Sequence, residues 1–255
     1  MLYRSILSIL FATALTVGVS SCASQSTNPA LIEEAIANPE RIDSHKERDA
    51  RSNPAVVLKL LNLQPDDTAV DIFGGGGYYA DLMAGIVGPN GKVILQNNKP
   101  YLKWVKKEVQ ERYIDATVPG VEALVSEVDD LQLPSGINSV LMVMSFHDLF
   151  FVDAKRGWGN TDIKDFLNQL NTAMVPGARL VIIDHAAEAG TGSAAVQKLH
   201  RIDENFVKTT ITDSGFSFVE SNDSLRNPND DKSKMVFAKD VRGKTDRFIL
   251  VFAKQ

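Results

Sequence analysis

The feature that most constrains the fold of this chain is a run of four glycines, Gly74–Gly77, directly after an apolar strand. The strand, Thr68–Ile72, carries one acid, Asp71, and a helix is predicted over 78–87. Because glycine has no Cβ, this backbone can turn sharply and let a ligand contact its amides. A glycine-rich turn between a strand and a helix predicts an open α/β sheet that binds ligands at the carboxyl ends of its strands.

Strands and helices alternate along the chain after this turn. Further strands are predicted over 91–97, 123–126, 140–144 and 179–184, with helices over 104–112 and 163–173. Continuous apolar strands separated by helices indicate a parallel sheet covered on both faces. Two last strands, 215–219 and 247–252, have no helix of similar size between them. The sequence therefore predicts a mostly parallel sheet of seven strands that ends in an antiparallel hairpin.

Three short helices are predicted before the sheet. One covers 29–37, a charged one runs through 44–49, and a third, over 55–61, is opened by Asn53-Pro54. We expect them to pack near the ligand-binding edge of the sheet, where Arg51 and its charged neighbours could reach a substrate. A solvated charged face is the more ordinary interpretation of these residues.

Composition limits the classes of function. The 255 residues are 44% hydrophobic and 23% charged, which suits one α/β domain with a sizeable core. The net charge of −5 argues against a large basic surface, so we expect no nucleic-acid partner. After residue 21 no apolar run approaches the roughly 20 residues that a bilayer span needs.

The N-terminus has the layout of a secretory signal. Arg4 precedes an apolar segment, Ile6–Val19, and small residues lead to Cys22, the only cysteine in the chain. This layout resembles a bacterial lipoprotein signal, which implies lipidation at Cys22. The expected organisation is a signal peptide over 1–21, a tether and helical arm over 22–52, and one domain over 53–255. The resemblance implies an exported protein at the periplasmic face, held at a membrane only through Cys22.

The acid beside the glycines indicates the kind of cofactor. The segment Gly75–Ala80 fits the loose dinucleotide pattern, but a pyrophosphate would be repelled by Asp71. A cofactor that carries positive charge, such as S-adenosylmethionine (SAM), would be favoured there. The residues resemble motif I of class I SAM-dependent methyltransferases, D-x-G-x-G-x-G, with Phe73 in the place of the first glycine. The resemblance implies a SAM site at Asp71, Phe73, Gly74, Gly75, Gly76, Gly77 and Tyr78.

Two later turns should complete such a cofactor site. Methyltransferases usually place an acid that binds ribose at the end of the second strand, where this chain has Asn97. An amide can bond ribose hydroxyls, but without charge assistance. After the third strand, Asp129 and Asp130 resemble the acidic turn that meets the adenine amino group.

The predicted catalytic residues follow the fourth and fifth strands. His147 and Asp148 come after the fourth strand and His185 after the fifth, so all three belong to the rim that bears the glycines. A histidine there could remove a proton from an oxygen or nitrogen nucleophile, because its ordinary pKa is near neutrality. The alternative is a polar residue that only caps a strand.

A helix predicted over 196–207 should add substrate contacts. His200 and Asp203 lie three residues apart beside its apolar stripe, and with Arg51 they are the candidate substrate residues. Histidines and acids also raise the hypothesis of a metal site. Their spacing matches no metal motif, so no metal is assigned.

Longer segments carry a wider resemblance. Five of them, Asp71–Tyr79, His147–Leu149, Asp184–Thr191, Leu199–Asp203 and Arg242–Phe248, together look like a bacterial group of predicted methyltransferases. The group implies methyl transfer from SAM to oxygen or nitrogen of a small molecule, assisted by histidine, with S-adenosylhomocysteine as product. Export conflicts with a cofactor made in the cytoplasm, so the alternative is an exported binding protein that holds a nucleoside-like or anionic ligand in the same crevice.

Overall fold

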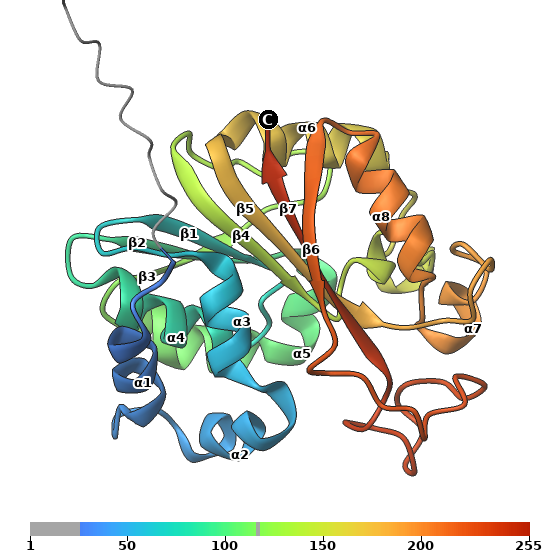
Figure 1. Ribbon diagram of the computed structural model, residues 1–255, viewed down its shortest axis with the longest axis horizontal. Coiled ribbons are helices and arrows are strands. Elements are labelled where there is room, and N and C mark those ends of the chain that lie inside the picture. The colour runs from blue at the N-terminus through green and yellow to red at the C-terminus, as the bar shows by residue number, and fades with distance from the viewer. Residues whose placement is uncertain (1–25, 116–117) are drawn as a thin grey trace, which may run out of the picture.

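Seven strands form one sheet in the order β3-β2-β1-β4-β5-β7-β6 in the computed structural model, which describes residues 26–115 and 118–255 (Figure 1). The strands are β1 Thr68–Ile72, β2 Lys92–Asn97, β3 Val121–Val125, β4 Ile137–Val143, β5 Met174–His185, β6 Phe216–Asn222 and β7 Arg247–Lys254. Strands β1 to β5 pair in parallel, whereas β7 runs antiparallel to both β5 and β6. The predicted mostly parallel sheet with a C-terminal antiparallel hairpin is confirmed.

Helices cover both faces of the sheet. They are α1 Pro29–Ala37, α2 Asp43–Ser52, α3 Pro54–Leu61, α4 Tyr78–Val87, α5 Lys99–Val109, α6 Ile163–Ala173, α7 Val196–Leu199 and α8 Glu204–Thr212. Side chains of α6 and α8 pack with Val70 and Phe248 on one face, and those of α1, α3 and α4 pack with Ala69 and Ile249 on the other. Alternate residues of a strand point to opposite faces, so these apolar strands form two cores.

The N-terminal helices belong to the second of these cores. Ala35 of α1 contacts α4 at Gly85, where an added Cβ would lie 2.9 Å from the Ala35 Cβ. In α2, His45 is buried and its Nδ1 lies 3.2 Å from Asp81 of α4. The interpretation of this charged segment as a solvated face is therefore wrong for His45, whereas Ser44, Lys46, Glu47 and Arg51 are exposed as it predicts.

The helix predicted over 196–207 is also wrong. Helix α7 ends at Leu199, His200 adopts a left-handed conformation with φ 52°, and α8 begins only at Glu204. Between them Ile202 pairs with Ala186, at the end of β5. The guanidinium of Arg201 is fully buried in an ion pair with Asp230. In a continuous amphipathic helix this guanidinium would lie beside solvent. Long-range pairing overrides the helical periodicity here.

The crossover after β2 begins earlier and ends later than the predicted helix over 104–112. Asn98 caps α5 by accepting a hydrogen bond from the amide of Tyr101, so the helix starts at Lys99. A π-helical segment, η1 Gln110–Asp115, continues it and brings Tyr113 to the carbonyls of the glycine turn. Two short 3₁₀ segments, η2 His147–Phe150 and η3 Ala154–Arg156, follow β4.

No helix within residues 26–115 and 118–255 is long and apolar enough to cross a membrane. The predicted signal peptide and Cys22 lie outside the described residues.

Candidate functional site

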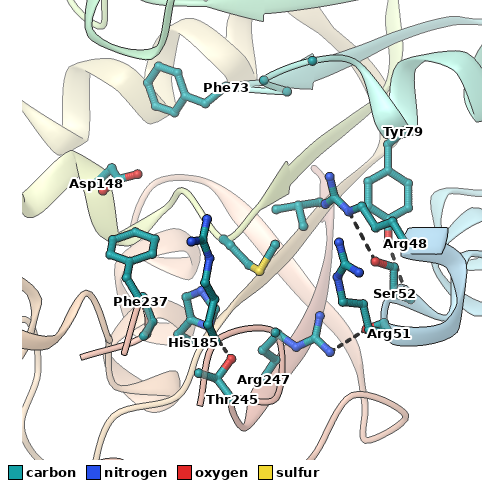
Figure 2. A pocket seen from close by; sticks show the side chains of 18 of the residues that line it. Arg48, Arg51, Ser52, Phe73, Tyr79, Asp148, His185, Phe237, Thr245 and Arg247 are labelled. Atoms are coloured by element: carbon teal, nitrogen blue, oxygen red, sulfur yellow. Dashed lines mark hydrogen bonds between the residues drawn. The ribbon is translucent and has the colours of Figure 1, made fainter. Parts of the chain in front are cut away.

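A cavity of about 780 Å³ opens at the carboxyl ends of β1, β4 and β5 (Figure 2). The glycine turn forms one part of its wall, and the residues after β4 and β5 form another. A third part comes from α2 and from the segment 236–247 before and at the start of β7. Open α/β sheets bind ligands at this rim.

The glycine turn is held in place by side-chain amides of β2. The Gln96 Oε1 accepts a hydrogen bond from the Phe73 amide at 3.2 Å, and Asn97 bonds both the amide and the carbonyl of Gly75 at 3.0 Å. Phe73 and Gly75 have positive φ values of 52° and 62°. The turn therefore forms with phenylalanine in the place of the first glycine, in a conformation that glycine adopts with less strain.

Most amides of this turn donate hydrogen bonds within the protein, against the expectation that a ligand would contact them. Gly74 donates to the carbonyl of Gln96, Gly75 to the side chain of Asn97, and Gly77 to the carbonyl of Gly74. The glycines contribute to the cavity because they have no side chains, so other groups can approach their backbone closely. A Cβ at Gly74 would lie 2.5 Å from the carboxyl group of Asp71, so that position admits only glycine without rearrangement.

Asp71 is a buried acid at the wall of the cavity. It is 1% exposed, and among the described residues its Oδ2 has no hydrogen-bond partner. Burial raises its pKa to about 7, although the Arg48 guanidinium acts in the opposite direction. A buried carboxylate with an unpaired oxygen suits a ligand that brings a donor or a positive charge.

Two stacked aromatic rings, Phe73 and Tyr101, line the cavity. Phe73 stacks on Tyr101 with ring centroids 5.0 Å apart, and the Tyr101 hydroxyl donates to Asp148 Oδ2 at 2.6 Å. Phe73 and Asp148 also line a smaller neighbouring cavity of about 290 Å³ that contains Asp129 and Trp158. Phe73 and Asp148 thus lie between two hollows of the same rim.

His147 is held between carboxylates. Its Nδ1 lies 2.7 Å from Asp184 Oδ1, and its Nε2 lies 3.2 Å from Asp148 Oδ1. Burial alone would lower the pKa of His147, but the charges of Asp148 and Asp184 outweigh it and hold that pKa well above its ordinary value. Neither ring nitrogen is left for a substrate proton in this arrangement.

His185 has a different environment. Its Nδ1 lies 2.7 Å from the Thr245 hydroxyl, and the side chain lines the cavity. Burial, assisted by the positive charges of His147 and Arg247, holds the pKa of His185 well below its ordinary value. The ring is therefore neutral at neutral pH.

Five cationic side chains line the cavity, and we call them the basic wall: Arg48, Arg51, Arg242, Lys244 and Arg247. Figure 2 shows Arg48, Arg51 and Arg247 grouped on one side, with Asp148 and Phe237 on the other. Arg247 is 9% exposed, its Nη2 donates to the carbonyl of Arg51, and within the described residues its Nε has no partner. Burial lowers the pKa of Arg247, and the charges of Arg48 and Arg51 act in the same direction.

The structure brings most of the predicted site residues to this cavity. Those that line it are Arg51, Asp71, Phe73, Gly74, Gly75, Gly76, His147, Asp148 and His185. His200 is not among the lining residues, but its Nδ1 lies 3.3 Å from His147 Nε2. The roles predicted for these residues stay predictions.

Other predicted residues have structural partners of their own. Tyr78 donates its hydroxyl to Asp49, and Gly77 is covered by the ring of Tyr113. Asp203 caps α8 by accepting from the amide of Asn205. Asn97 is committed to Gly75, and none of these residues lines the cavity. Asp130 is exposed and accepts a hydrogen bond from Gln132.

Sequence reasoning gave no role to Tyr101, Asp184, Arg242, Lys244 and Arg247. Asp184 supports His147 from the end of β5, and Tyr101 supports Asp148 from α5. Arg242, Lys244 and Arg247 stand close together just before and at the start of the last strand. These cationic residues next to a predicted strand were the signal in the sequence for a charged wall of the site. A sequence does not show, however, which way such side chains point.

Comparisons with known proteins agree with this architecture. The family model of protein-L-isoaspartate (D-aspartate) O-methyltransferase matches residues 34–123, from α1 to β3. A SAM-dependent methyltransferase from Aquifex aeolicus is 20% identical, with a TM-score of 0.57 over 88% of this chain and 97% of its own. No curated protein sequence matches the chain.

Two further structures are similar. A chain of the complex between the Haloferax volcanii Trm112 methyltransferase activator and a methyltransferase is 14% identical, with a TM-score of 0.58 over 83% of this chain and 91% of its own. Fibrillarin from Aeropyrum pernix, solved with natively bound SAM, is 12% identical, with a TM-score of 0.51 over 81% and 76%. Likeness at these identities shows the fold, and the strand order agrees with it. The chain has the Rossmann-like fold of class I SAM-dependent methyltransferases.

Proposed function

We propose that this protein is a SAM-dependent methyltransferase that acts on oxygen or nitrogen of a small acidic molecule. The observation that carries the proposal is the cavity at the rim of the sheet, where the close-approach glycines adjoin the unpaired carboxyl oxygen of Asp71. Its volume of about 780 Å³ lies in the upper part of the range of about 300–1000 Å³ for ligand pockets. There is room for a second small molecule beside a cofactor.

Several residues fit the cofactor. The backbone of Gly74–Gly76 offers a surface without side chains, and Asp71 offers a carboxylate that a positive charge would favour. When bound, SAM supplies an electrophilic methyl group on a sulfonium. The role of the protein in this reaction is to align the nucleophile with that methyl group and to exclude water.

His185 is the side chain that we assign to proton acceptance. Its Nδ1 is engaged with Thr245, which leaves Nε2 as the nitrogen that can take a proton from a hydroxyl or amine. His147 does not suit this role because both of its nitrogens face carboxylates. We assign His147 and Asp148 to the wall that positions the substrate.

The basic wall supports an acidic substrate. One cation is enough to pair with the carboxylate of SAM, and five line the cavity. Arg247 is buried with an unpaired Nε, so a bound anion would relieve the cost of that burial. The double variant Arg51→Gln/Lys244→Gln should therefore weaken binding of small acids more than it weakens binding of S-adenosylhomocysteine.

Calorimetry with S-adenosylhomocysteine tests the proposal. We expect one molecule to bind per chain, and Asp71→Ala to weaken that binding by at least tenfold. A folded protein that gives no heat with this ligand would exclude the proposed function. Binding without methyl transfer to any of a panel of small acids would instead favour the alternative of a binding protein.

We also propose that the chain is exported and lipid-anchored through Cys22, as its first residues predict. Fractionation of cells that express the full chain should find it in the membrane fraction, and a Cys22→Ala variant should leave that fraction. If both forms stay in the cytoplasm, the export proposal is wrong and the supply of SAM presents no difficulty.

A further inference from the structure

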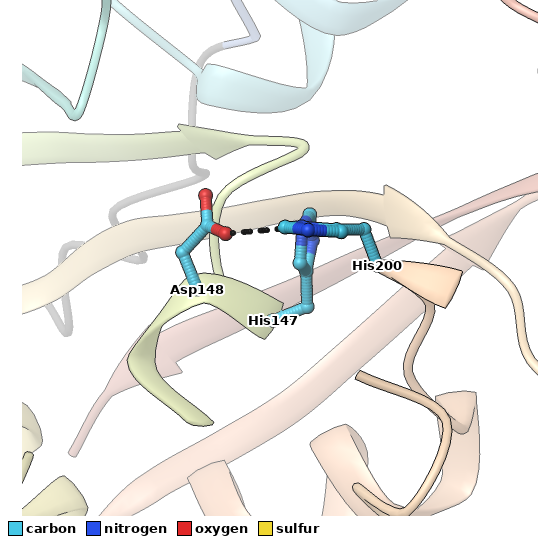
Figure 3. Close-up of side chains that lie close together, drawn as sticks. All are labelled: His147, Asp148 and His200. Atoms are coloured by element: carbon cyan, nitrogen blue, oxygen red, sulfur yellow. Dashed lines mark hydrogen bonds and ion pairs between the residues drawn. The ribbon is translucent and has the colours of Figure 1, made fainter. Parts of the chain in front are cut away.

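Three side chains from two separate segments point their ligand atoms at one another beside the cavity. His147 and Asp148 belong to η2, and His200 follows α7 (Figure 3). The Nε2 of His147 lies 3.3 Å from His200 Nδ1 and 3.2 Å from Asp148 Oδ1, and the third side of this triangle is 3.6 Å. From these contacts we propose that His147, Asp148 and His200 bind a divalent transition-metal ion of the zinc class.

The size of the triangle fits a tetrahedral ion. Zinc lies about 2.0–2.2 Å from nitrogen and oxygen ligands, and the edge of a tetrahedron is about 1.6 times that length, or about 3.3–3.6 Å. The three measured separations are 3.2, 3.3 and 3.6 Å. Two imidazoles and one carboxylate are also a donor set that suits zinc and similar ions.

Hydrogen bonds alone satisfy this cluster poorly. An imidazole nitrogen carries at most one proton, so His147 Nε2 can donate along only one of its two short edges. The remaining edge, between His200 Nδ1 and Asp148 Oδ1, is 3.6 Å long, which is beyond a good hydrogen bond. A cation bound at this triangle would displace the proton between His147 Nε2 and Asp148 to solvent, and it would then use a lone pair of all three atoms at once.

Neighbouring residues fix the orientation of the three side chains, as is usual for metal ligands. The fully buried carboxylate of Asp184 accepts a hydrogen bond from His147 Nδ1 at 2.7 Å, which fixes the orientation of that ring. Histidine ligands of metals usually donate their other N–H to such a carboxylate. Tyr101 fixes the second oxygen of Asp148, and the rings of Phe151 and Phe237 lie 4.7 and 5.1 Å from the ring of His200.

The position of the cluster gives the ion access to a ligand. His147 and Asp148 line the cavity, so an ion bound to them adjoins it. Three protein ligands leave one position of a tetrahedron for water or a substrate atom, as in catalytic zinc sites. The proposal does not depend on methyl transfer, because the site would bind metal whether or not SAM enters the cavity.

The test measures zinc binding to the untagged full chain by calorimetry and by elemental analysis after dialysis. We expect one equivalent of zinc in the parent, at least a hundredfold weaker binding in His200→Gln, and recovery in His200→Cys, because a thiolate also binds zinc. His45→Gln is the matched control. That histidine also lies between two acids, Asp81 and Glu108, but its two nitrogens face different carboxylates and share no central point.

Two results would overturn the proposal. One is a folded parent chain that binds no zinc. The other is zinc binding that persists unchanged in both His200→Gln and Asp148→Asn. The second variant is included because it keeps the shape of the side chain, so a loss of binding with an unchanged melting temperature separates a missing ligand from misfolding.

Discussion

Replacing Asp71 with asparagine should change how the stability of this protein depends on pH. The carboxyl group has an ordinary pKa of 3.8, and burial raises it to about 7 in the folded chain. The folded state therefore binds a proton more tightly than the unfolded state. The contribution of Asp71 to the free energy of unfolding is highest below pH 3.8 and falls as the pH rises, until the pH passes 7.

The magnitude follows from the two pKa values. One pKa unit corresponds to about 1.4 kcal/mol, so the ionised side chain costs the folded state about 4 kcal/mol above both values. Between about pH 5 and about pH 8 the same linkage gives a change of about 3 kcal/mol. The parent chain should lose this much relative to Asp71→Asn, whose amide has nearly the same shape and does not ionise.

Urea denaturation of both proteins at several pH values measures this difference directly. A constant difference between the parent and Asp71→Asn would show that Asp71 is ionised throughout, and the account of its burial would then be wrong. A ligand with positive charge at Asp71 should also release a proton on binding near pH 7, and the asparagine variant should not.

Other changes give distinct outcomes. Gly75→Ala and Gly88→Ala both place alanine at positive φ, so both should lower the free energy of unfolding in urea denaturation. The loss should be larger for Gly88→Ala, because φ 71° with ψ −169° suits only glycine, but only Gly75→Ala, at the cavity, should weaken binding of S-adenosylhomocysteine in calorimetry. Equal affinity in the two variants would refute a cofactor at this turn. Asp230→Asn leaves the fully buried Arg201 guanidinium partly unpaired and should lower the unfolding free energy by about 3 kcal/mol, which a loss under 1 kcal/mol would contradict. Phe73→Gly relieves a strained φ worth about 1–2 kcal/mol but removes a buried ring worth about 3–5, so the melting temperature should fall.

The order of strands and helices could be read from the sequence because its local patterns agree with the fold. The turn at Gly74–Gly77, the strand Thr68–Ile72 and the helix Ile163–Ala173 are each specified by residues within a few positions of one another. The reversed hairpin followed from the missing helix between β6 and β7. Element ends were predicted less well, since the strand predicted over 179–184 begins five residues earlier, at Met174 of β5.

The chemistry of the site was harder to predict because it depends on contacts between distant segments. Sequence placed His147 and His185 on one rim, but it could not show that Asp184 takes one nitrogen of His147. It also could not show that Arg51 and Arg247 face the same cavity, since 196 residues separate them. Periodicity reports which face of an element is apolar, and it carries no information about the partner of a polar side chain.

The non-helical stretch between α7 and α8 shows why one local error affects several parts of the site. His200 turns back toward His147, Arg201 pairs with Asp230 and so anchors the segment that carries Arg242 and Lys244, and Ile202 pairs with Ala186 beside His185. A continuous helix would separate these contacts, because its residues at successive positions point in different directions. The break costs the hydrogen bonds of about one helical turn, and the buried ion pair and the strand-like bridge replace them. The orientation of His200, the basic wall and the proposed base His185 therefore depend on the non-helical stretch 200–202, none of whose residues lines the cavity.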